Sequence, residues 1–187
     1  KYPTLYSLVP SKKDLKQLET LLKDINNTFN LDQCNSSIYK LDNNIFRKKC
    51  IPELDKLQDN IDTDRNLIDL LREKLSMMID KKAYEKDRKF LINAGKNAQY
   101  NHYIYASPLR IEKLKRIIND NKFSHLPIGQ YELKRGDFNF QVIGKGKTRI
   151  DLECIHISSS KLMENTELMR NMIETKFSEW CQNTYRK

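Results

Sequence analysis

A run without glycine or proline, residues 53–80, constrains this chain more than any other feature. Its apolar residues recur at alternating spacings of three and four, which predicts a helix that packs lengthwise on another helix. At 1.5 Å per residue, the run corresponds to a helix of about 40 Å, longer than a compact core of this size needs. Pro52 suits the first helical position. The seam consists of Leu54, Leu57, Ile61, Asp64, Ile68, Leu71, Leu75 and Met78, with Asp64 as its one polar member.

Two further long helices are predicted, one before this helix and one at the end of the chain. Ser11 is placed to cap the first helix, with Asp14 in the capping-box position. Residues 158–160 are placed to cap the last helix, residues 161 to about 185. The apolar seam of the first helix is Leu15, Leu18, Leu22, Ile25 and Phe29, and the apolar face of the last is Leu162, Met169, Ile173, Phe177 and Trp180.

Strand-like patterns occupy the middle of the chain. Residues 90–93 and 103–106 flank a Gly/Asn-rich turn at residues 95–102, which predicts a hairpin. A short helix is expected around residues 109–118, and a loop at residues 127–129. Further strands are expected at residues 131–133, 138–143 and 150–157, with a basic turn at residues 144–149.

These patterns predict an α+β fold that is mainly α, with long antiparallel helices carrying a small antiparallel β-sheet insertion. Four segments follow from them. They are N-terminal helices in residues 1–50, a long helix in residues 51–80, a basic β-rich insertion in residues 81–157 and a returning helix in residues 158–187.

Positive charge is concentrated in the β-rich segment. The chain has a formal net charge of +9. Residues 81–150 contain 16 Lys and Arg against 6 Asp and Glu, a balance of +10, whereas the remainder contains 18 against 19. This asymmetry indicates that the insertion binds a polyanion. A charge that served only solubility would be spread more evenly along the chain.

Basic and amide side chains on two turns are the candidate contacts. Phosphate oxygens are bound by Lys and Arg, by amide side chains and by backbone N–H groups, and the glycines of the second turn let its backbone come close to a ligand. A solvated loop is the alternative interpretation, and nothing in the pattern predicts readout of base sequence. The predicted DNA-binding residues are Lys96, Asn97, Gln99, Asn101, Lys145, Lys147 and Arg149.

The sequence predicts no catalytic residue, cofactor site or metal site. Residues 144–148 lack the spacing of a phosphate-binding loop. The serines near His156 are explained as a helix cap, and Cys154 and His156 as part of a strand. The four cysteines form no Cys-x-x-Cys pair, so buried free thiols in a reducing, intracellular compartment are expected. No apolar run approaches the roughly 18 residues of a membrane span.

The order of helix seam, basic β insertion and helix seam resembles the lever and clamp region, domains III and IV, of MutS-type mismatch-repair ATPases. Residues 52–57, Pro-Glu-Leu-Asp-Lys-Leu, look like the Pro-Glu-Leu-Asp-x-Leu that opens the lever helix. Gly95-x-Asn97 followed by Tyr103-Ile104 is similar to the clamp hairpin. The Lys/Asn-rich composition looks like that of the giant-virus and octocoral-mitochondrial branch. The usual Arg-Gln-Thr-Leu stretch of the clamp is not recognisable.

The resemblance covers roughly residues 50–187 and implies a function. It implies that the insertion is a clamp gripping the phosphate backbone of double-stranded DNA without reading its sequence. The helices would couple that grip to a distant ATPase domain in a parent protein that acts in DNA repair, binds ATP and Mg elsewhere, and forms a dimer. This fragment itself would not be an enzyme.

A structural interaction module is the competing hypothesis. In it, a coiled-coil scaffold carries the basic insertion as a dock for an acidic protein partner. A stable dimer that is indifferent to DNA would favour the scaffold. An enzyme is the third alternative, and it would need a complete triad or metal cluster that the sequence does not display.

Overall fold

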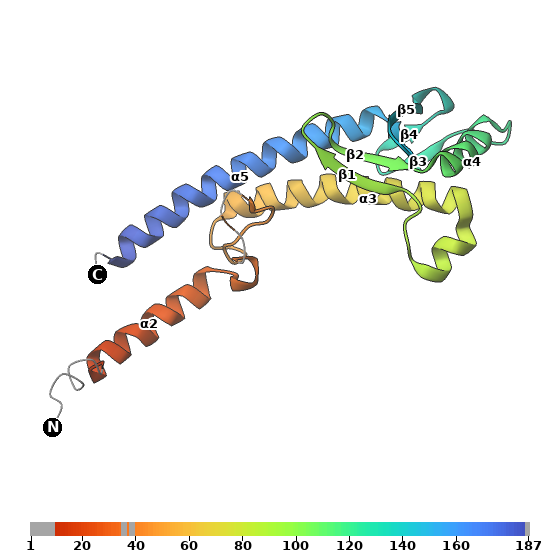
Figure 1. Ribbon diagram of the computed structural model, residues 1–187. Helices are drawn as coiled ribbons and strands as arrows, with labels where there is room; N and C mark the ends of the chain where they lie inside the picture. The colour runs from red at the N-terminus through yellow and green to blue at the C-terminus, as the bar shows by residue number, and fades with distance from the viewer. Residues whose placement is uncertain (1–9, 35–36, 38–39, 186–187) are drawn as a thin grey trace. The chain divides into compact units, whose positions relative to one another are not determined.

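The computed structural model describes residues 10–34, 37 and 40–185 (Figure 1). It confirms an α+β fold that is mainly helical. The helices are α2 (Lys12–Thr28), α3 (Pro52–Asp87), α4 (Pro108–Asn119) and α5 (Glu153–Tyr185), with 3-10 turns η1 (Leu31–Gln33) and η3 (Arg135–Asp137). The strands are β1 (Asn93–Asn97), β2 (Asn101–Ala106), β3 (Leu126–Ile128), β4 (Tyr131–Leu133), β5 (Asn139–Gly144) and β6 (Lys147–Asp151).

The chain divides into two compact units. One comprises residues 1–58 and 168–187, and the other comprises residues 59–167. Helices α3 and α5 each contribute residues to both units. All six strands belong to the second unit.

The first unit is built around Phe29. Its ring contacts those of Phe46, Phe177 and Trp180, at centroid distances of 5.0, 5.7 and 4.9 Å. Arg170 adds polar contacts, donating from Nε to the Leu41 carbonyl at 2.6 Å. Aromatic pairs at these distances contribute beyond the area they bury, so this cluster organises the unit.

Helix α2 has the predicted N-cap but no buried face. Ser11 Oγ accepts from the Asp14 N–H and the Asp14 carboxylate accepts from the Ser11 N–H, which confirms the capping box. These hydrogen bonds lower the pKa of the Asp14 carboxyl. However, Leu15, Leu18 and Leu22 are 48%, 54% and 58% exposed. Of the predicted seam, only Phe29 at the C-terminal end is buried, whereas these three leucines pack on no partner surface within the described residues.

Helix α3 confirms the long helix predicted from the seam. It begins at Pro52, and Leu54, Ile61, Ile68, Leu71 and Leu75 of the seam are buried. Asp80 departs from helical geometry (φ −159°, ψ 93°), so the predicted end coincides with a kink, beyond which a second helical stretch runs to Asp87. Asp80 Oδ1 accepts from the Ala83 N–H and so caps that stretch.

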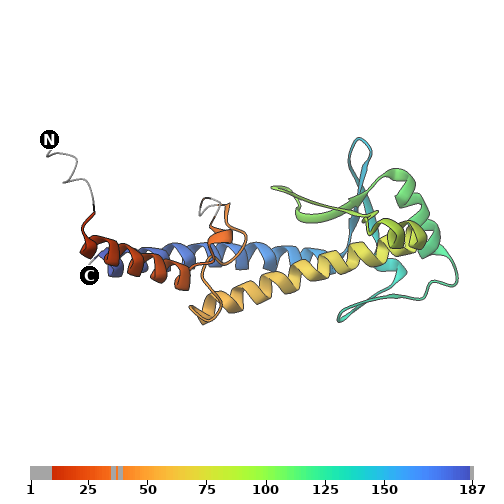
Figure 2. The same cartoon turned by 90° about the horizontal axis from the view of Figure 1, so that it is seen from below.

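The second unit holds a four-stranded antiparallel sheet in the order β1-β2-β6-β5 and a separate β3-β4 hairpin. One face of the larger sheet is a core face. Ile104, Ala106, Thr148 and Ile150 are buried there. Helix α4 lies on this face, since Lys115 Nζ lies 5.3 Å from the ring centroid of Phe140 in β5. Figures 1 and 2 show α3 and α5 beside the sheet within this unit.

Four predicted features differ from the structure. Residues 152–157 are not a strand, because the N–H groups of Ile155 and His156 donate to the Leu152 carbonyl and start α5. The predicted serine cap therefore lies inside α5, where Ser158 and Ser159 are buried. The predicted loop at residues 127–129 is partly strand β3. The first hairpin strand begins at residue 93, three residues later than predicted.

The cysteines also differ from the expectation. All four are free, but Cys34 and Cys50 are exposed and Cys181 is partly exposed, leaving only Cys154 buried. Burial raises the pKa of the Cys154 thiol. A buried neutral thiol behaves as a small apolar side chain, so Cys154 belongs to the packing of α5.

Ser76 anchors the segment that enters the sheet. Its hydroxyl is fully buried in α3 and accepts from the N–H groups of Leu91 and Ile92, at 2.9 and 3.1 Å. Arg72 Nε donates to the Ile92 carbonyl at 3.2 Å. Helix α3 thus fixes where β1 begins.

Replacing Ser76 with alanine is expected to lower the free energy of unfolding by about 2 kcal/mol, because it leaves two backbone donors without their acceptor. Urea denaturation followed by circular dichroism measures this. Ser178→Ala, on an exposed position of α5, is the control and should change stability by less than about 0.5 kcal/mol. Equal stability of the two variants would contradict the anchoring role.

Candidate nucleic-acid interface

The first candidate turn joins β1 and β2 and displays amide side chains. Asn97 Oδ1 accepts from the N–H groups of Gln99 and Tyr100, at 3.1 and 2.7 Å, which closes a three-residue turn. Asn101 follows with φ +55°, a conformation that asparagine tolerates. Lys96, Asn97 and Gln99 are exposed, and Asn101 is partly exposed. The structure therefore presents this predicted cluster at one tip of the sheet.

The second candidate turn joins β5 and β6 and displays lysines. Gly144 pairs with Lys147, leaving Lys145 and Gly146 in the turn. Gly146 has φ +71°, which favours glycine. No atom lies within 4 Å of a Cβ placed on Gly144 or Gly146, so a ligand can approach this backbone closely. Lys145 and Lys147 are both exposed.

The two turns lie at opposite ends of the sheet. Strand β2 starts at the first turn with Asn101 and ends beside the second, where Ala106 pairs with Thr148. At about 3.4 Å per residue, the ends of this six-residue strand are about 17 Å apart. The sequence predicts DNA contacts at both turns. One phosphate cannot touch both turns, so a shared ligand must extend along β2.

Arg149 is part of the sheet and is not free to reach outward. Only 8% of the residue is exposed. Its Nη2 donates to Gln141 Oε1 at 2.8 Å and pairs with Asp151 Oδ2 at 3.1 Å. Asp151 is also bound by His156 through its other oxygen. The guanidinium carbon lies 4.2 Å from the centroid of the Tyr100 ring. Strand alternation places Arg149 on the same face of β6 as Lys147, but Arg149 is buried there and held by its partners.

A row of tyrosines lies on the sheet face opposite the core face. Tyr103 and Tyr105 alternate with buried Ile104 and Ala106, so they point to the other side. Ring centroids are 5.7 Å apart for both the Tyr100–Tyr103 and the Tyr103–Tyr105 pair. Lys147 Nζ lies 5.2 Å from the Tyr105 centroid. We call Tyr100, Tyr103, Tyr105, Lys147 and Arg149 the tyrosine face.

The sequence leaves two interpretations of these tyrosines open: all three could stack on bases, or Tyr103 and Tyr105 could be sheet packing. The signal that identifies them is the strict alternation of Tyr103 and Tyr105 with Ile104 and Ala106. That pattern marks a strand with one buried and one accessible aromatic face.

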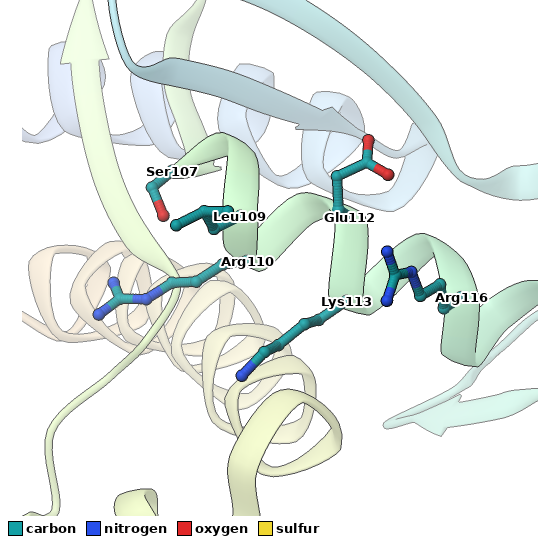
Figure 3. A pocket seen from close by; sticks show the side chains of 6 residues that line it. All are labelled: Ser107, Leu109, Arg110, Glu112, Lys113 and Arg116. Atoms are coloured by element: carbon teal, nitrogen blue, oxygen red, sulfur yellow. The ribbon is translucent and has the colours of Figure 1, made fainter.

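A basic hollow lies along α4, which the sequence did not identify as a site. Its volume is about 610 Å³, and Figure 3 shows the side chains of Arg110 and Lys113 extending from the same side of the helix. Arg110 Nη1 donates to the Leu91 carbonyl at 2.9 Å, so this arginine also holds the entry to β1. The lining residues are Ser107, Leu109, Arg110, Glu112, Lys113 and Arg116.

Metal sites and membrane-spanning helices are both absent from the described part of the chain. Among residues 10–34, 37 and 40–185, no group of three or more His, Cys, Asp or Glu side chains is arranged to hold a metal ion. None of the helices in those ranges has the length and apolar character needed to cross a membrane.

Comparison with known proteins shows a similarity to a viral protein. No protein-family model matches the chain. The chain is 26% identical over 142 residues to a protein of Acanthamoeba polyphaga mimivirus named "Putative DNA mismatch repair protein mutS homolog L359". The similarity supports a MutS-like relationship. It covers 74% of this chain but only 13% of the length of the viral protein.

Proposed function

We propose that the basic β-rich insertion, residues 81–157, binds the phosphate backbone of double-stranded DNA without reading its sequence. In this proposal the insertion is the clamp of a MutS-like DNA-repair protein. Residues 51–80 form its lever helix, residues 158–187 the return lever and residues 1–50 the preceding helices. The observation that carries the proposal is the exposed Lys145–Lys147 turn, whose open glycine backbone lies within a segment of charge +10.

The side chains at the two turns suit phosphate contacts. Lysine is a flexible point charge that can follow a phosphate without fixed geometry. Amide side chains and backbone N–H groups add hydrogen bonds that position the ligand but carry no sequence information. Lys96, Asn97, Gln99 and Asn101 supply these groups at the first turn, and Lys145 and Lys147 at the second. In this proposal Arg149 does not contact DNA but stabilises the sheet through Gln141 and Asp151.

Coupling to ATP hydrolysis is proposed for the parent protein and not for this chain. The resemblance to MutS-type ATPases and the similarity to the viral mutS homolog motivate it. In this proposal the ATP and Mg site and the dimer contacts belong to other parts of the parent protein, and the chain contributes the grip on DNA.

A scaffold that docks an acidic protein is the second candidate. The exposed leucines of α2 favour it, since Leu15, Leu18 and Leu22 form an apolar stripe that suits a partner helix. Light scattering after size-exclusion chromatography, with and without duplex DNA, separates the candidates. The scaffold requires a stable dimer whose mass is unchanged by DNA, whereas the clamp requires a DNA complex.

Binding is expected to be indifferent to base sequence. Two duplexes of equal length and unrelated sequence should bind with dissociation constants within about twofold of each other, because phosphate contacts carry no base information. Fluorescence anisotropy at low salt measures both. A preference above about tenfold would indicate base contacts and contradict backbone binding.

A further inference from the structure

We propose that the tyrosine face is a second nucleic-acid site, which binds unpaired bases of single-stranded DNA by stacking. The inference rests on the proposed function only in taking nucleic acid as the ligand. It concerns the rings along β2 between the two turns, a surface that shares only Lys147 with the duplex contacts assigned to the turns.

The Tyr103 ring packs over Gly95, which is its cross-strand partner in β1. A Cβ placed on Gly95 would lie 2.5 Å from Tyr103 Cζ and 2.7 Å from its hydroxyl oxygen. The end of the ring therefore occupies the space that a side chain at position 95 would fill. Tyr103 is nevertheless partly exposed, so part of the ring faces solvent. An exposed aromatic surface is what a base needs for stacking.

The three rings form a continuous row. Centroid separations of 5.7 Å place Tyr100 against Tyr103 and Tyr103 against Tyr105 at the distances of direct aromatic contact. Neighbouring rings that already touch leave no room for a base between them. Bases would therefore lie on the outer ring faces, in a row that follows β2.

Cations lie beside this row. Lys147 Nζ lies near the Tyr105 ring, and the Arg149 guanidinium lies against Tyr100. The carboxylate of Asp151 is on the same side of the sheet, but it is paired with Arg149 and His156. A single strand could thus place bases on tyrosines while Lys147 neutralises a phosphate. Rows of aromatic rings beside positive charge are the usual means of binding single strands without sequence preference.

Amide side chains share this side of the sheet. Asn93 pairs with Tyr105, and Gln141 and Arg149 pair across β5 and β6, so strand alternation places these amides with the tyrosines. Amides can donate to and accept from base edges. The rings are inclined to one another, at 71° for Tyr100–Tyr103 and 39° for Tyr103–Tyr105, so each offers its own stacking surface. A surface of rings and amides suits bases better than it suits an acidic peptide, which would need exposed cations in greater number.

The test uses the full chain and a fluorescein-labelled oligothymidylate of about 12 nucleotides. An abasic oligomer of the same length keeps the phosphates but lacks the bases, and a short duplex reports the turn contacts. Wild-type protein should bind oligothymidylate about tenfold more tightly than the abasic oligomer. Equal affinity for the two would overturn the inference. Displacement of oligothymidylate by polyglutamate at equal charge would also overturn it, in favour of an acidic protein ligand.

Substitutions of single tyrosines identify which rings stack on bases. Tyr103→Leu and Tyr105→Leu should each weaken oligothymidylate binding about tenfold, and Tyr103→Phe should change it by less than about twofold, because phenylalanine keeps the stacking ring. Tyr131→Leu, a partly exposed tyrosine of the separate β3-β4 hairpin, is the matched control and should have no effect. Equal losses for Tyr103→Phe and Tyr103→Leu would assign the effect to the hydroxyl and contradict stacking.

Measurement of duplex binding by the same variants separates this inference from the proposed function. Tyr103→Leu and Tyr105→Leu should leave duplex affinity within about twofold of wild type, since paired bases are not available to stack. Failure of duplex binding with retained oligothymidylate binding would remove the proposed function and leave this inference standing. Duplex binding without any single-strand binding would do the reverse.

Discussion

Reversing the charge of both Lys145 and Lys147 to glutamate is expected to weaken binding to duplex DNA at least about tenfold at low salt. Both side chains are exposed on the β5–β6 turn, where the backbone is open to a close ligand. Each lysine that contacts a phosphate releases about one counterion, so the slope of log affinity against log salt should fall by about two. Anisotropy titrations at several salt concentrations measure both quantities.

A control with the same change in net charge separates local contact from general attraction. Lys12 and Lys13 are exposed in α2, and their reversal to glutamate changes the net charge of the chain equally. This pair should change duplex affinity by less than about threefold and leave the salt slope intact. Equal losses for the two double variants would contradict a specific contact at the β5–β6 turn. Circular dichroism should show unchanged folding, because surface substitutions of this kind rarely destabilise.

Replacing Arg149 with alanine is expected to lower the free energy of unfolding by about 3 kcal/mol. The change removes the hydrogen bond to Gln141, the ion pair with Asp151 and the contact with the Tyr100 ring. Its side chain is only 10% exposed, so water cannot replace these interactions fully. Urea denaturation measures the loss.

Arg149→Lys tests whether the forked guanidinium matters. A lysine ammonium cannot hold Gln141 and Asp151 together with the same planar geometry, so it should recover less than half of the stability. The salt slope of duplex binding should stay at the wild-type value in folded Arg149→Lys. Arg149→Ala removes the charge, so unchanged stability combined with a loss of about one unit in the salt slope of that variant would restore Arg149 as a direct phosphate contact.

The helical parts of this fold could be predicted because their signals are local. The capping box of Ser11 and Asp14, the Pro52 start and the α3 seam each depend on residues within one or two turns. The start of α5 was missed because Ile155 and Ile157 alternate with polar residues, as they would in a strand. The buried residues 154, 155, 158, 159 and 162 instead follow helical spacing, and Ser159 accepts from the His102 N–H of β2.

The candidate site could be predicted only in part, because it depends on strand register. Spacing identified Lys96, Asn97, Lys145 and Lys147 as exposed residues of two turns. It could not show that the order β1-β2-β6-β5 sends these turns to opposite ends. Pairing with Tyr105 and Gln141 also buries Arg149 in a cluster that no local pattern reveals.

The salt dependence of duplex binding by the wild-type chain tests the central claim most directly. With phosphate contacts from Lys96, Lys145 and Lys147, log affinity should fall with log salt at a slope of about −2.7. Anisotropy titrations between about 50 and 200 mM salt measure this slope. A slope near zero, or no duplex binding at the lowest salt, would contradict backbone binding by the insertion.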